Sequence, residues 1–323
     1  MIQLAMYPEL PARLFPAGFL AGLEAPLTEF RSERARERLG RARVLVTGWG
    51  CPPLDEPALA AAPLLEAVVH AAGSVKGHVG PAVFARGIQV SSAAAANAIP
   101  VAEYTLAVIL LANKGVPALA REYRARRGDL GLPRRDLDVG NHGRTVGVVG
   151  ASRVGRRVLE LLRPFDLRPL LADPYVPVET AGALGALLVD LDELFAMSDV
   201  VTLHAPATPE TRHMVDARRL RLMRDGATLV NTARGALVDQ DALLAELVTG
   251  RLSAVLDVTE PEITPAGSPL WDLPNVILTP HVAGALGDEL PRLGVAAMEE
   301  VRRALAGEPL RDRVDPAALS ITA

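Results

Sequence analysis

The sequence contains a single cysteine, Cys51, among its 323 residues. One cysteine excludes a disulfide within the chain and favours a reducing compartment, so we expect the cytoplasm. Lysine is nearly as scarce: Lys76 and Lys114 are the only two, and arginine supplies the other basic residues. These arginines are scattered and the net charge is −4. We therefore expect no nucleic-acid partner, because nucleic-acid binding needs clustered positive charge.

Long apolar runs are also missing. Half of the sequence is hydrophobic, yet no run reaches the roughly 20 residues that span a bilayer. The longest candidate, 101–112, is interrupted by Glu103 and Tyr104, which predicts a buried helix. The opening residues, MIQLAMYPEL, place no basic region ahead of an apolar stretch. We therefore expect neither a secretory signal nor a membrane partner.

Short apolar runs alternate with helical stretches from residue 144 onward. The expected strands are 145–149, 168–172, 199–204, 227–232, 253–258 and 276–278, and the expected helices are 154–165, 192–197, 217–223 and 241–248. Strands that alternate with helices at this spacing predict an α/β fold with a doubly wound parallel sheet, buried on both faces.

The first hundred residues predict a smaller α/β domain, with strands at 43–46, 65–70 and 88–90. Residues 101–127 indicate one long helix or a broken pair that begins after Pro100, because proline favours the first turn of a helix.

The last helix, near 288–306, follows the final expected strand. We expect it to pack back on the N-terminal domain, which makes that domain discontinuous. The predicted domains are therefore 1–99 with 287–323, and 100–286.

The stretch GVVGASRVG, residues 147–155, follows a predicted strand and opens a predicted helix. It matches the dinucleotide-binding pattern G-x-G-x-x-G except at its middle glycine, which is Ser152. Gly150 permits the tight turn, and Gly155 lets helix and strand approach closely. The Ser152 hydroxyl can donate to a phosphate oxygen at the helix N-terminus, and Arg153 adds positive charge.

Asp173 ends the second strand, 23 residues after Gly150. A carboxylate at this place accepts hydrogen bonds from ribose hydroxyls and repels a 2′-phosphate, so it favours NAD over NADP. The alternative is a glycine turn in an unliganded α/β domain, with Asp173 as a helix cap. The strand–helix–strand context favours the dinucleotide.

Three chemically useful residues follow successive strands: Arg234, Glu262 and His281. Ligands bind at the carboxyl ends of parallel strands, so these side chains are expected to meet at one edge. Arg234 can fork its donors onto a carboxylate, and a carboxylate beside His281 would stabilise the imidazolium. Taken singly, each residue has a structural interpretation. Arg234 could form a surface ion pair, Glu262 could be a solvated turn residue, and His281 could be a hydrogen-bonded loop residue.

The segments 150–173, 204–211, 231–239 and 271–284 resemble the D-isomer-specific 2-hydroxyacid dehydrogenases, a family that includes phosphoglycerate dehydrogenase, glyoxylate reductase and D-lactate dehydrogenase. The resemblance runs from about 71 to 305. Two departures stand out. Ser152 replaces the family's usual glycine, and the loop 71–76 keeps Gly73 but lacks the acidic residue that commonly follows it.

The resemblance implies two Rossmann-like or flavodoxin-like domains, with NAD in the cleft between them and a 2-keto or 2-hydroxy acid as substrate. It implies that His281 is the acid–base, that Glu262 orients and tunes it, and that Arg234 binds the substrate's carboxylate and carbonyl. Glu262 is preferred to Glu260 because it lies five residues after Asp257.

The resemblance also implies binding residues for both ligands. For the cofactor they are Gly150, Ser152, Arg153, Val154, Gly155, Asp173, Pro174, His204, Ala205, Pro206, Thr211, Thr232, Ala233, Arg234, Asp257, His281 and Gly284. For the substrate they are Gly73, Ser74, Val75, Arg234 and His281. No metal is expected. A homodimer is implied, because in this family the segments equivalent to 101–127 and 128–143 embrace a partner subunit.

Four points stay open. Two alternative functions are possible on the same fold. One is a formate-dehydrogenase-like enzyme, whose branch of the family carries Gln at the position of Glu262. The other is an NAD-sensing binding protein like the corepressors of this fold. Trp49 either walls the substrate pocket or simply packs. Lys76 either recognises a second acidic group on the substrate or is a solvated loop lysine.

Overall fold

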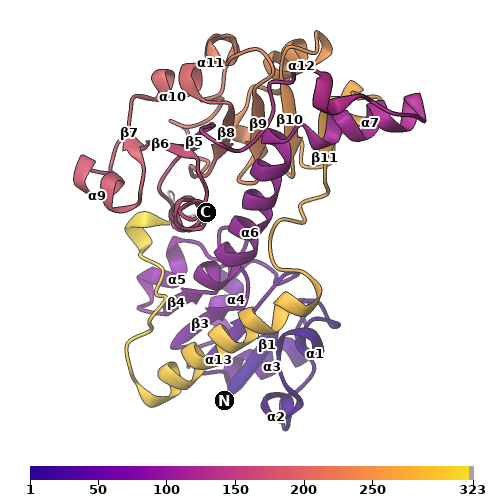
Figure 1. Ribbon diagram of the computed structural model, residues 1–323. Helices are drawn as coiled ribbons and strands as arrows, with labels where there is room; N and C mark the ends of the chain where they lie inside the picture. The colour runs from indigo at the N-terminus through magenta and orange to yellow at the C-terminus, as the bar shows by residue number, and fades with distance from the viewer. Residues whose placement is uncertain (320–323) are drawn as a thin grey trace. The chain divides into compact units, whose positions relative to one another are not determined.

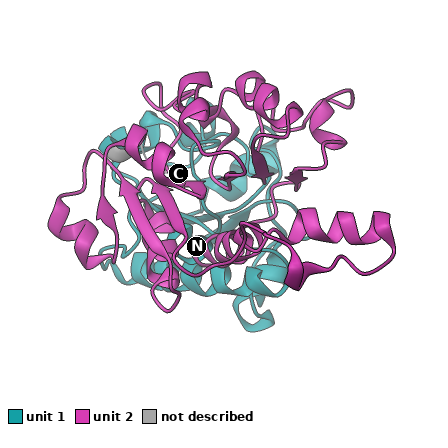
Figure 2. Ribbon diagram, turned by 45° about the horizontal axis from the view of Figure 1, so that its top comes forward, with its two compact units in different colours: residues 1–98, 285–323 teal, residues 99–284 magenta. Residues whose placement is uncertain are grey.

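The structure is a computed structural model that describes residues 1–319 (Figure 1). The chain divides into two compact units (Figure 2). Unit 1 combines Met1–Ala98 with the chain from Ala285 onward, and unit 2 is Ile99–Gly284. These boundaries lie within two residues of the predicted ones.

Unit 2 contains a seven-stranded parallel sheet in the order β11-β10-β9-β8-β5-β6-β7. The strands are β5 (Thr145–Val149), β6 (Arg168–Ala172), β7 (Leu187–Leu188), β8 (Val200–Leu203), β9 (Thr228–Asn231), β10 (Ser253–Leu256) and β11 (Val276–Leu278). From β5 the chain runs outward through β6 and β7, then returns to β8 on the other side of β5. The order of strands therefore reverses between β5 and β8, the place where doubly wound sheets bind ligands.

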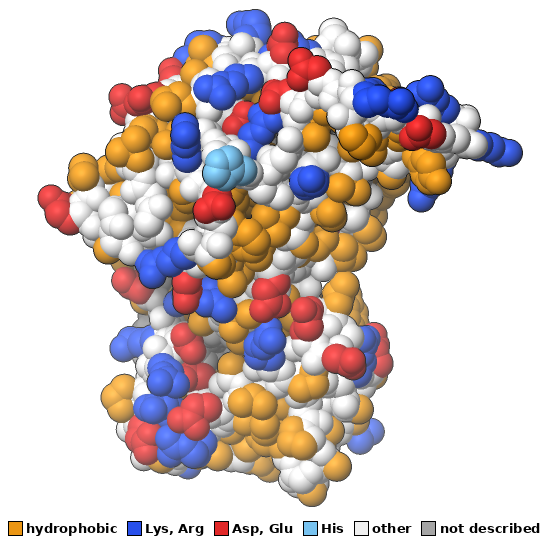
Figure 3. Space-filling view, in the orientation of Figure 1, with side chains coloured by type: hydrophobic (Ala, Val, Ile, Leu, Met, Phe, Trp, Pro, Cys, Tyr) orange, Lys and Arg blue, Asp and Glu red, His pale blue; other side chains and the backbone are white. Residues whose placement is uncertain are grey.

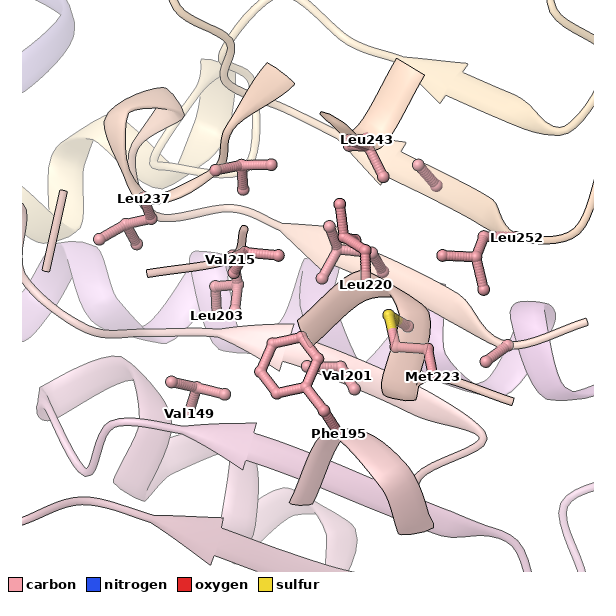
Figure 4. Close-up of a cluster of buried hydrophobic side chains, with 14 of the residues drawn as sticks. Val149, Phe195, Val201, Leu203, Val215, Leu220, Met223, Leu237, Leu243 and Leu252 are labelled. Carbon is pink, nitrogen blue, oxygen red and sulfur yellow. The ribbon is translucent and has the colours of Figure 1, made fainter. Parts of the chain in front are cut away.

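Both faces of this sheet are buried, because successive residues of its strands enter different hydrophobic clusters. Val149, Val201 and Leu203 belong to one cluster (Figure 4), and Val148 and Val200 belong to the other. The flanking helices are α6 (Ala94–Asn113), whose first five residues belong to unit 1, α7 (Val116–Arg126), α8 (Arg153–Leu162), α9 (Val178–Ala183), α10 (Leu191–Met197), α11 (Ala217–Leu222) and α12 (Gln240–Val248), with short 3-10 turns at Leu132–Arg134, Gly235–Leu237 and Pro269–Trp271.

Unit 1 contains a four-stranded parallel sheet in the order β1-β2-β3-β4. Its strands are β1 (Ile2–Ala5), β2 (Val44–Thr47), β3 (Ala67–His70) and β4 (Gln89–Ser92). Its helices are α1 (Pro11–Leu14), α2 (Ala17–Leu20), α3 (Glu33–Gly40), α4 (Glu56–Ala60), α5 (Pro81–Ala85) and α13 (Leu290–Ala306), with 3-10 turns at Gly287–Glu289 and Pro316–Ala318. Leu293 and Val301 of α13 share a buried cluster with Val46, so the last helix packs on the N-terminal sheet.

Several details differ from the sequence-based expectation. Among the strands, β1 and β7 were not predicted. The helix predicted to begin after Pro100 begins earlier, so that prediction was wrong: α6 starts at Ala94 and contains Pro100. Proline removes one backbone donor from a helix interior, and buried contacts further along α6, at Ala102 and Ile109, stabilise the helix in spite of that loss. Gly115, in the left-handed conformation with φ 62°, separates α6 from α7.

Two helices of unit 2 have unusual surfaces. By length and composition alone, α6 is the one helix among residues 1–319 that could cross a membrane, although Ala102, Thr105 and Ile109 are buried in the protein. α7 has no buried residue. It projects away from the rest of unit 2 in both ribbon views (Figures 1 and 2).

Candidate active site

The glycine turn follows β5 at the reversal point of the sheet. Gly150 has φ 93° and its N–H donates to the Ala172 carbonyl at 2.9 Å. A Cβ on Gly150 would lie 2.9 Å from the backbone nitrogen of Ala205, and one on Gly155 would lie 2.0 Å from the Gly150 carbonyl oxygen. Neither position has room for a side chain. The turn is therefore packed directly between β8 and the start of α8.

Ser152 is the N-cap of α8. Its backbone is extended, with φ −62° and ψ 177°, and its hydroxyl accepts from the Gly155 N–H at 3.3 Å. The middle position of the turn thus needs no left-handed backbone, and serine fits without strain. Among residues 1–319, the N–H groups of Ser152, Arg153 and Val154 have no acceptor. Unpaired donors at a helix N-terminus suit a pyrophosphate.

Asp173 lies beside this turn. Its Oδ2 accepts from the Ala151 N–H at 2.7 Å, and its Oδ1 accepts from the Tyr175 N–H at 2.9 Å. Each carboxylate oxygen can accept a second hydrogen bond, so the group is fixed in place and still able to bind ribose hydroxyls. Pro174 follows at the exposed surface. The residues of the turn and Asp173 together fit a dinucleotide.

The segment after β8 lies against the turn, but His204 turns inward. Its side chain is 3% exposed, and its Nε2 lies 3.0 Å from the Thr202 hydroxyl. Burial lowers the pKa of His204 to about 3, so the ring is neutral. Any contact with a cofactor would come from its backbone. The Pro206 carbonyl accepts a hydrogen bond from the Thr211 hydroxyl at 2.6 Å, and this bond closes the turn that follows.

His281 and Glu262 form the shortest polar contact of the candidate site. His281 Nδ1 lies 2.5 Å from Glu262 Oε1, and the two side chains are 50% and 58% exposed. Glu260 instead contacts Arg212 at 2.8 Å and His213 at 3.5 Å. The chain therefore pairs Glu262, rather than Glu260, with the histidine that the sequence singled out.

Asp257, at the end of β10, shapes the turn that carries His281. It is 2% exposed. Its Oδ1 accepts from the Thr279 hydroxyl at 2.7 Å and the Val282 N–H at 2.8 Å, and its Oδ2 accepts from the Ala283 N–H at 2.9 Å. The His281 N–H donates to the Asp257 carbonyl at 2.9 Å, and His281 has φ 54°. These bonds fix the backbone from Thr279 to the residue before Gly284.

Arg234 lies in the segment after β9 and is partly buried. Its Nη1 donates to the Ala233 carbonyl at 2.6 Å, and the Asn231 amide binds the Arg234 carbonyl at 2.9 Å. Burial lowers the pKa of Arg234 and the charge of Glu262 acts in the opposite direction. Glu262 thus acts electrostatically on Arg234 while it contacts His281. The guanidinium retains donors for a substrate carboxylate.

Tyr104 and Thr105 of α6 are polar contacts that the sequence did not predict. The Tyr104 hydroxyl lies 3.0 Å from the Thr279 hydroxyl, which donates to Asp257. The Thr105 hydroxyl lies 3.1 Å from that of Thr232, a residue predicted to bind the cofactor. The available signal was a short polar stretch, 103–105, within a mostly apolar helix. α6 therefore supports the segments that follow β9 and β11.

The loop after β3 in unit 1 holds the predicted substrate-binding residues. Val75 is 4% exposed, and its carbonyl accepts from the His78 and Val79 N–H groups at 3.1 and 2.9 Å. Within residues 1–319, the N–H groups of Gly73, Ser74 and Val75 donate to no acceptor. Three consecutive free donors suit an anionic group.

The remaining candidates in unit 1 are at the surface. Trp49 is 40% exposed, and its carbonyl accepts from the Tyr7 N–H at 2.8 Å. The Lys76 N–H lies 3.4 Å from the Ser74 hydroxyl. In the part of the chain that the structure describes, no group of three or more His, Cys, Asp or Glu side chains could hold a metal ion.

Known proteins match this chain closely. The model of the D-isomer specific 2-hydroxyacid dehydrogenase NAD binding domain matches residues 106–283. D-3-phosphoglycerate dehydrogenase of Mycobacterium tuberculosis is 37% identical over 268 residues, 81% of this chain and 49% of that protein. Glyoxylate reductase of Korarchaeum cryptofilum is 34% identical over 258 residues, 79% of this chain and 78% of that protein. The chain thus spans about half the length of the phosphoglycerate dehydrogenases that it matches.

The crystal structure of the TT0316 protein from Thermus thermophilus superposes with a TM-score of 0.78 at 30% identity, and the match covers 98% of this chain and 100% of that one. The predicted α/β fold with parallel sheets and the predicted NAD cofactor of the family are confirmed by these matches. The chain belongs to the D-isomer specific 2-hydroxyacid dehydrogenase family.

Proposed function

We propose that the protein is an NAD-dependent oxidoreductase that interconverts a D-2-hydroxy acid and a 2-keto acid. The observation that carries this proposal is the contact between His281 and Glu262, with Arg234 in the field of the same carboxylate. An acid, its orienting carboxylate and a cation for the substrate carboxylate are the groups that keto-acid reduction requires. The family to which the chain belongs supplies the reaction class.

His281 is the proton donor in this proposal. Its Nδ1 is held by Glu262, which leaves Nε2 to give a proton to the keto oxygen. The Glu262 carboxylate balances the positive charge of the imidazolium and fixes the orientation of the ring. In the reverse direction the neutral Nε2 takes the hydroxyl proton back. NADH, when bound, supplies the hydride that reduces the keto carbon.

Arg234 has two roles in this proposal. Its guanidinium binds the substrate carboxylate in a forked contact, and it stabilises the negative charge that grows on the keto oxygen. Partial burial strengthens both interactions, because less water competes for the donors. Gly73, Ser74 and Val75 are proposed to donate their free N–H groups to the carboxylate as well.

The glycine turn and Asp173 are proposed to hold the cofactor. The unpaired N–H groups of Ser152, Arg153 and Val154 would bind the pyrophosphate, and Asp173 would bind the adenosine ribose. A carboxylate at this position repels a 2′-phosphate, so NADH is the expected partner. Pro174, Ala205, Pro206 and Thr211 would line the adenosine side. Thr232, Ala233, Asp257 and Gly284 would line the nicotinamide side.

The experiment that tests this function is NADH oxidation with glyoxylate, hydroxypyruvate and pyruvate, repeated with NADPH. Turnover of at least one keto acid, with a clear preference for NADH, is the expected result. Tight NADH binding without turnover of any keto acid would instead favour a sensor of the corepressor type. NAD reduction by formate would favour the formate-dehydrogenase-like rival.

We propose a homodimer that uses the segment 101–127, which includes α7, and the segment 128–143. None of the eleven residues of α7 is buried. Its apolar side chains Val116 and Tyr123 are 40% and 61% exposed. Figure 3 shows hydrophobic atoms among the Lys and Arg atoms of this projecting helix. Exposed apolar surface of this kind is typical of protein interfaces. Sedimentation equilibrium that gives the monomer mass would refute the dimer.

The cytoplasmic location of the protein stays a prediction from its single cysteine.

A further inference from the structure

Three polar side chains are buried together at the carboxyl end of the sheet in unit 1. Thr47 is the last residue of β2, and His70, its partner in the register, is the last residue of β3. His78 follows eight residues later, beyond the loop that holds the proposed substrate donors. The exposed fractions of Thr47, His70 and His78 are 0%, 4% and 7%. None of the three has a part in the proposed chemistry, so their burial needs another explanation.

The Thr47 hydroxyl joins the two imidazoles. Its Oγ1 lies 2.9 Å from His70 Nδ1 and 3.1 Å from His78 Nε2, and the ring centroids are 4.5 Å apart. A hydroxyl carries a single proton. When both rings are neutral, Thr47 can therefore donate to one ring and must accept from the other.

A third hydrogen bond fixes the direction of the chain of donors. His70 also bonds the backbone of Ser74, and this bond favours the protonated form of the ring, as a bond to a carbonyl does. Since Nδ1 is engaged by Thr47, the atom that donates to Ser74 is Nε2. Neutral His70 then has a bare Nδ1, so Thr47 donates to His70 and accepts from the Nε2–H of His78.

Burial keeps both rings neutral. It lowers the pKa of His70 to about 3, with a smaller contribution from the neighbouring His78, and the pKa of His78 to about 4. Near neutral pH the donor chain therefore runs one way, from His78 through Thr47 and His70 to the Ser74 carbonyl. Each proton along the chain is donated once, and all of the donors point in the same direction.

The end of this chain determines where the Val75 N–H points. In a trans peptide the carbonyl and the N–H point in opposite directions. If the Ser74 carbonyl is turned inward to His70, the N–H of Val75 is turned outward. A rotated peptide would instead present a carbonyl oxygen to an approaching carboxylate and repel it. Backbone bonds from Ala71 to Thr47 at 2.8 Å and from Leu54 to the His78 carbonyl at 2.9 Å hold the surrounding segments.

We propose that Thr47, His70 and His78 are positioning residues that hold the peptide between Ser74 and Val75 with its N–H directed at the substrate carboxylate. This inference rests on the proposed function, because it assigns a carboxylate to the loop. The three residues touch neither substrate nor cofactor. They act through the backbone of the loop.

Thr47→Val tests the proposal, because valine has the shape of threonine without the hydroxyl. The KM for the keto acid should rise about tenfold, the effect of losing one hydrogen bond to a charged group. The kcat and the Kd for NADH should change less than twofold, and Thr47→Ser should restore the KM. Ser91→Ala is the matched control, because the Ser91 hydroxyl is buried in neighbouring β4 without a partner among residues 1–319. It should leave the KM unchanged.

A second measurement needs no variant and no turnover. Correlation of ring nitrogens with ring protons by NMR should show both His70 and His78 as neutral Nε2–H tautomers at pH 7. An Nδ1–H tautomer or an imidazolium at either residue would overturn the proposal, and so would an unchanged KM in Thr47→Val. A wild-type protein that turns over no keto acid would overturn the proposed function, and this inference with it.

Discussion

His281 has one ring nitrogen held by Glu262 and one left for the substrate. Replacing it in His281→Ala removes the proton donor while Arg234 and the cofactor turn remain. The kcat for keto-acid reduction should fall by about two to four powers of ten, the usual contribution of a positioned acid. The decrease is measured from NADH absorbance at saturating substrate. The Kd for NADH should change much less than kcat, because the glycine turn and Asp173 remain in place.

The matched control is His213→Ala. His213 also lies near a glutamate, with its Nε2 3.5 Å from Glu260, and its side chain is 43% exposed. It shares the general surroundings of His281 without the proposed role, so turnover should be nearly normal. Equal losses in both variants would show that removal of an exposed histidine, rather than of the acid, causes the defect. Normal turnover in His281→Ala would contradict the assignment directly.

Asp173 carries the prediction on cofactor choice. In Asp173→Asn the side chain keeps its shape but loses the charge that binds ribose hydroxyls and repels a 2′-phosphate. The Kd for NADH should rise about ten- to a hundredfold, as expected for hydrogen bonds to a charged group. The preference for NADH over NADPH should shrink. Fluorescence titration with both cofactors measures this, and an unchanged ratio of the two Kd values would argue against the role.

Residue identities could be predicted where chemistry and position along a strand agree. Arg234, Glu262 and His281 each follow a strand, so parallel topology brings them to one edge. Tyr104 could not be found this way, because its partner Thr279 is 175 residues away and no strand end marks it. The inward turn of His204 was also beyond prediction, since a polar residue at a strand end is usually exposed.

At the scale of elements, α8 depends on its unusual cap. Ser152→Ala removes the hydroxyl that accepts from the Gly155 N–H and should lower the free energy of unfolding by about 1 kcal/mol. Ser152→Gly, which restores the family's usual residue, should lower the free energy of unfolding by only about a few tenths of a kcal/mol. Denaturant unfolding of both variants measures the difference. Equal stability of the alanine variant and the wild type would show that the cap contributes nothing.

Strands were predictable when clear signals bounded them. β5 and β6 were predicted to the residue, because Gly150 and Asp173 end their apolar runs. β1 was missed because its IQLA sequence is short and stands at the chain's start, so only pairing with β2 distinguishes it from a loop. Pro100 misled the placement of α6, since local preference favours a helix start there while tertiary packing of Ala102 and Ile109 supports a longer helix.

At the scale of the whole molecule, buried histidines make both units sensitive to acid. His70 and His78 lie in unit 1 and His204 in unit 2. Burial lowers their pKa values to about 3, about 4 and about 3. In the unfolded chain each would titrate near pH 6.5. The unfolded state therefore binds more protons between these values, so stability is fully present above about pH 6.5 and is lost as the pH falls toward about 3.

The melting temperature should accordingly fall steadily between pH 6.5 and pH 4, with each histidine contributing up to about 1.4 kcal/mol per pH unit. Carboxylates also titrate in this range, so a matched pair of variants is needed to isolate the imidazoles. His204→Gln removes a buried imidazole and should flatten the pH dependence. His142→Gln removes one whose side chain is 93% exposed and should leave the dependence unchanged.

Because the three rings are divided between the units, calorimetry should show His204→Gln acting on the transition of unit 2 if the units melt separately. Identical pH profiles for the two variants and the wild type would mean that carboxylates alone cause the acid sensitivity.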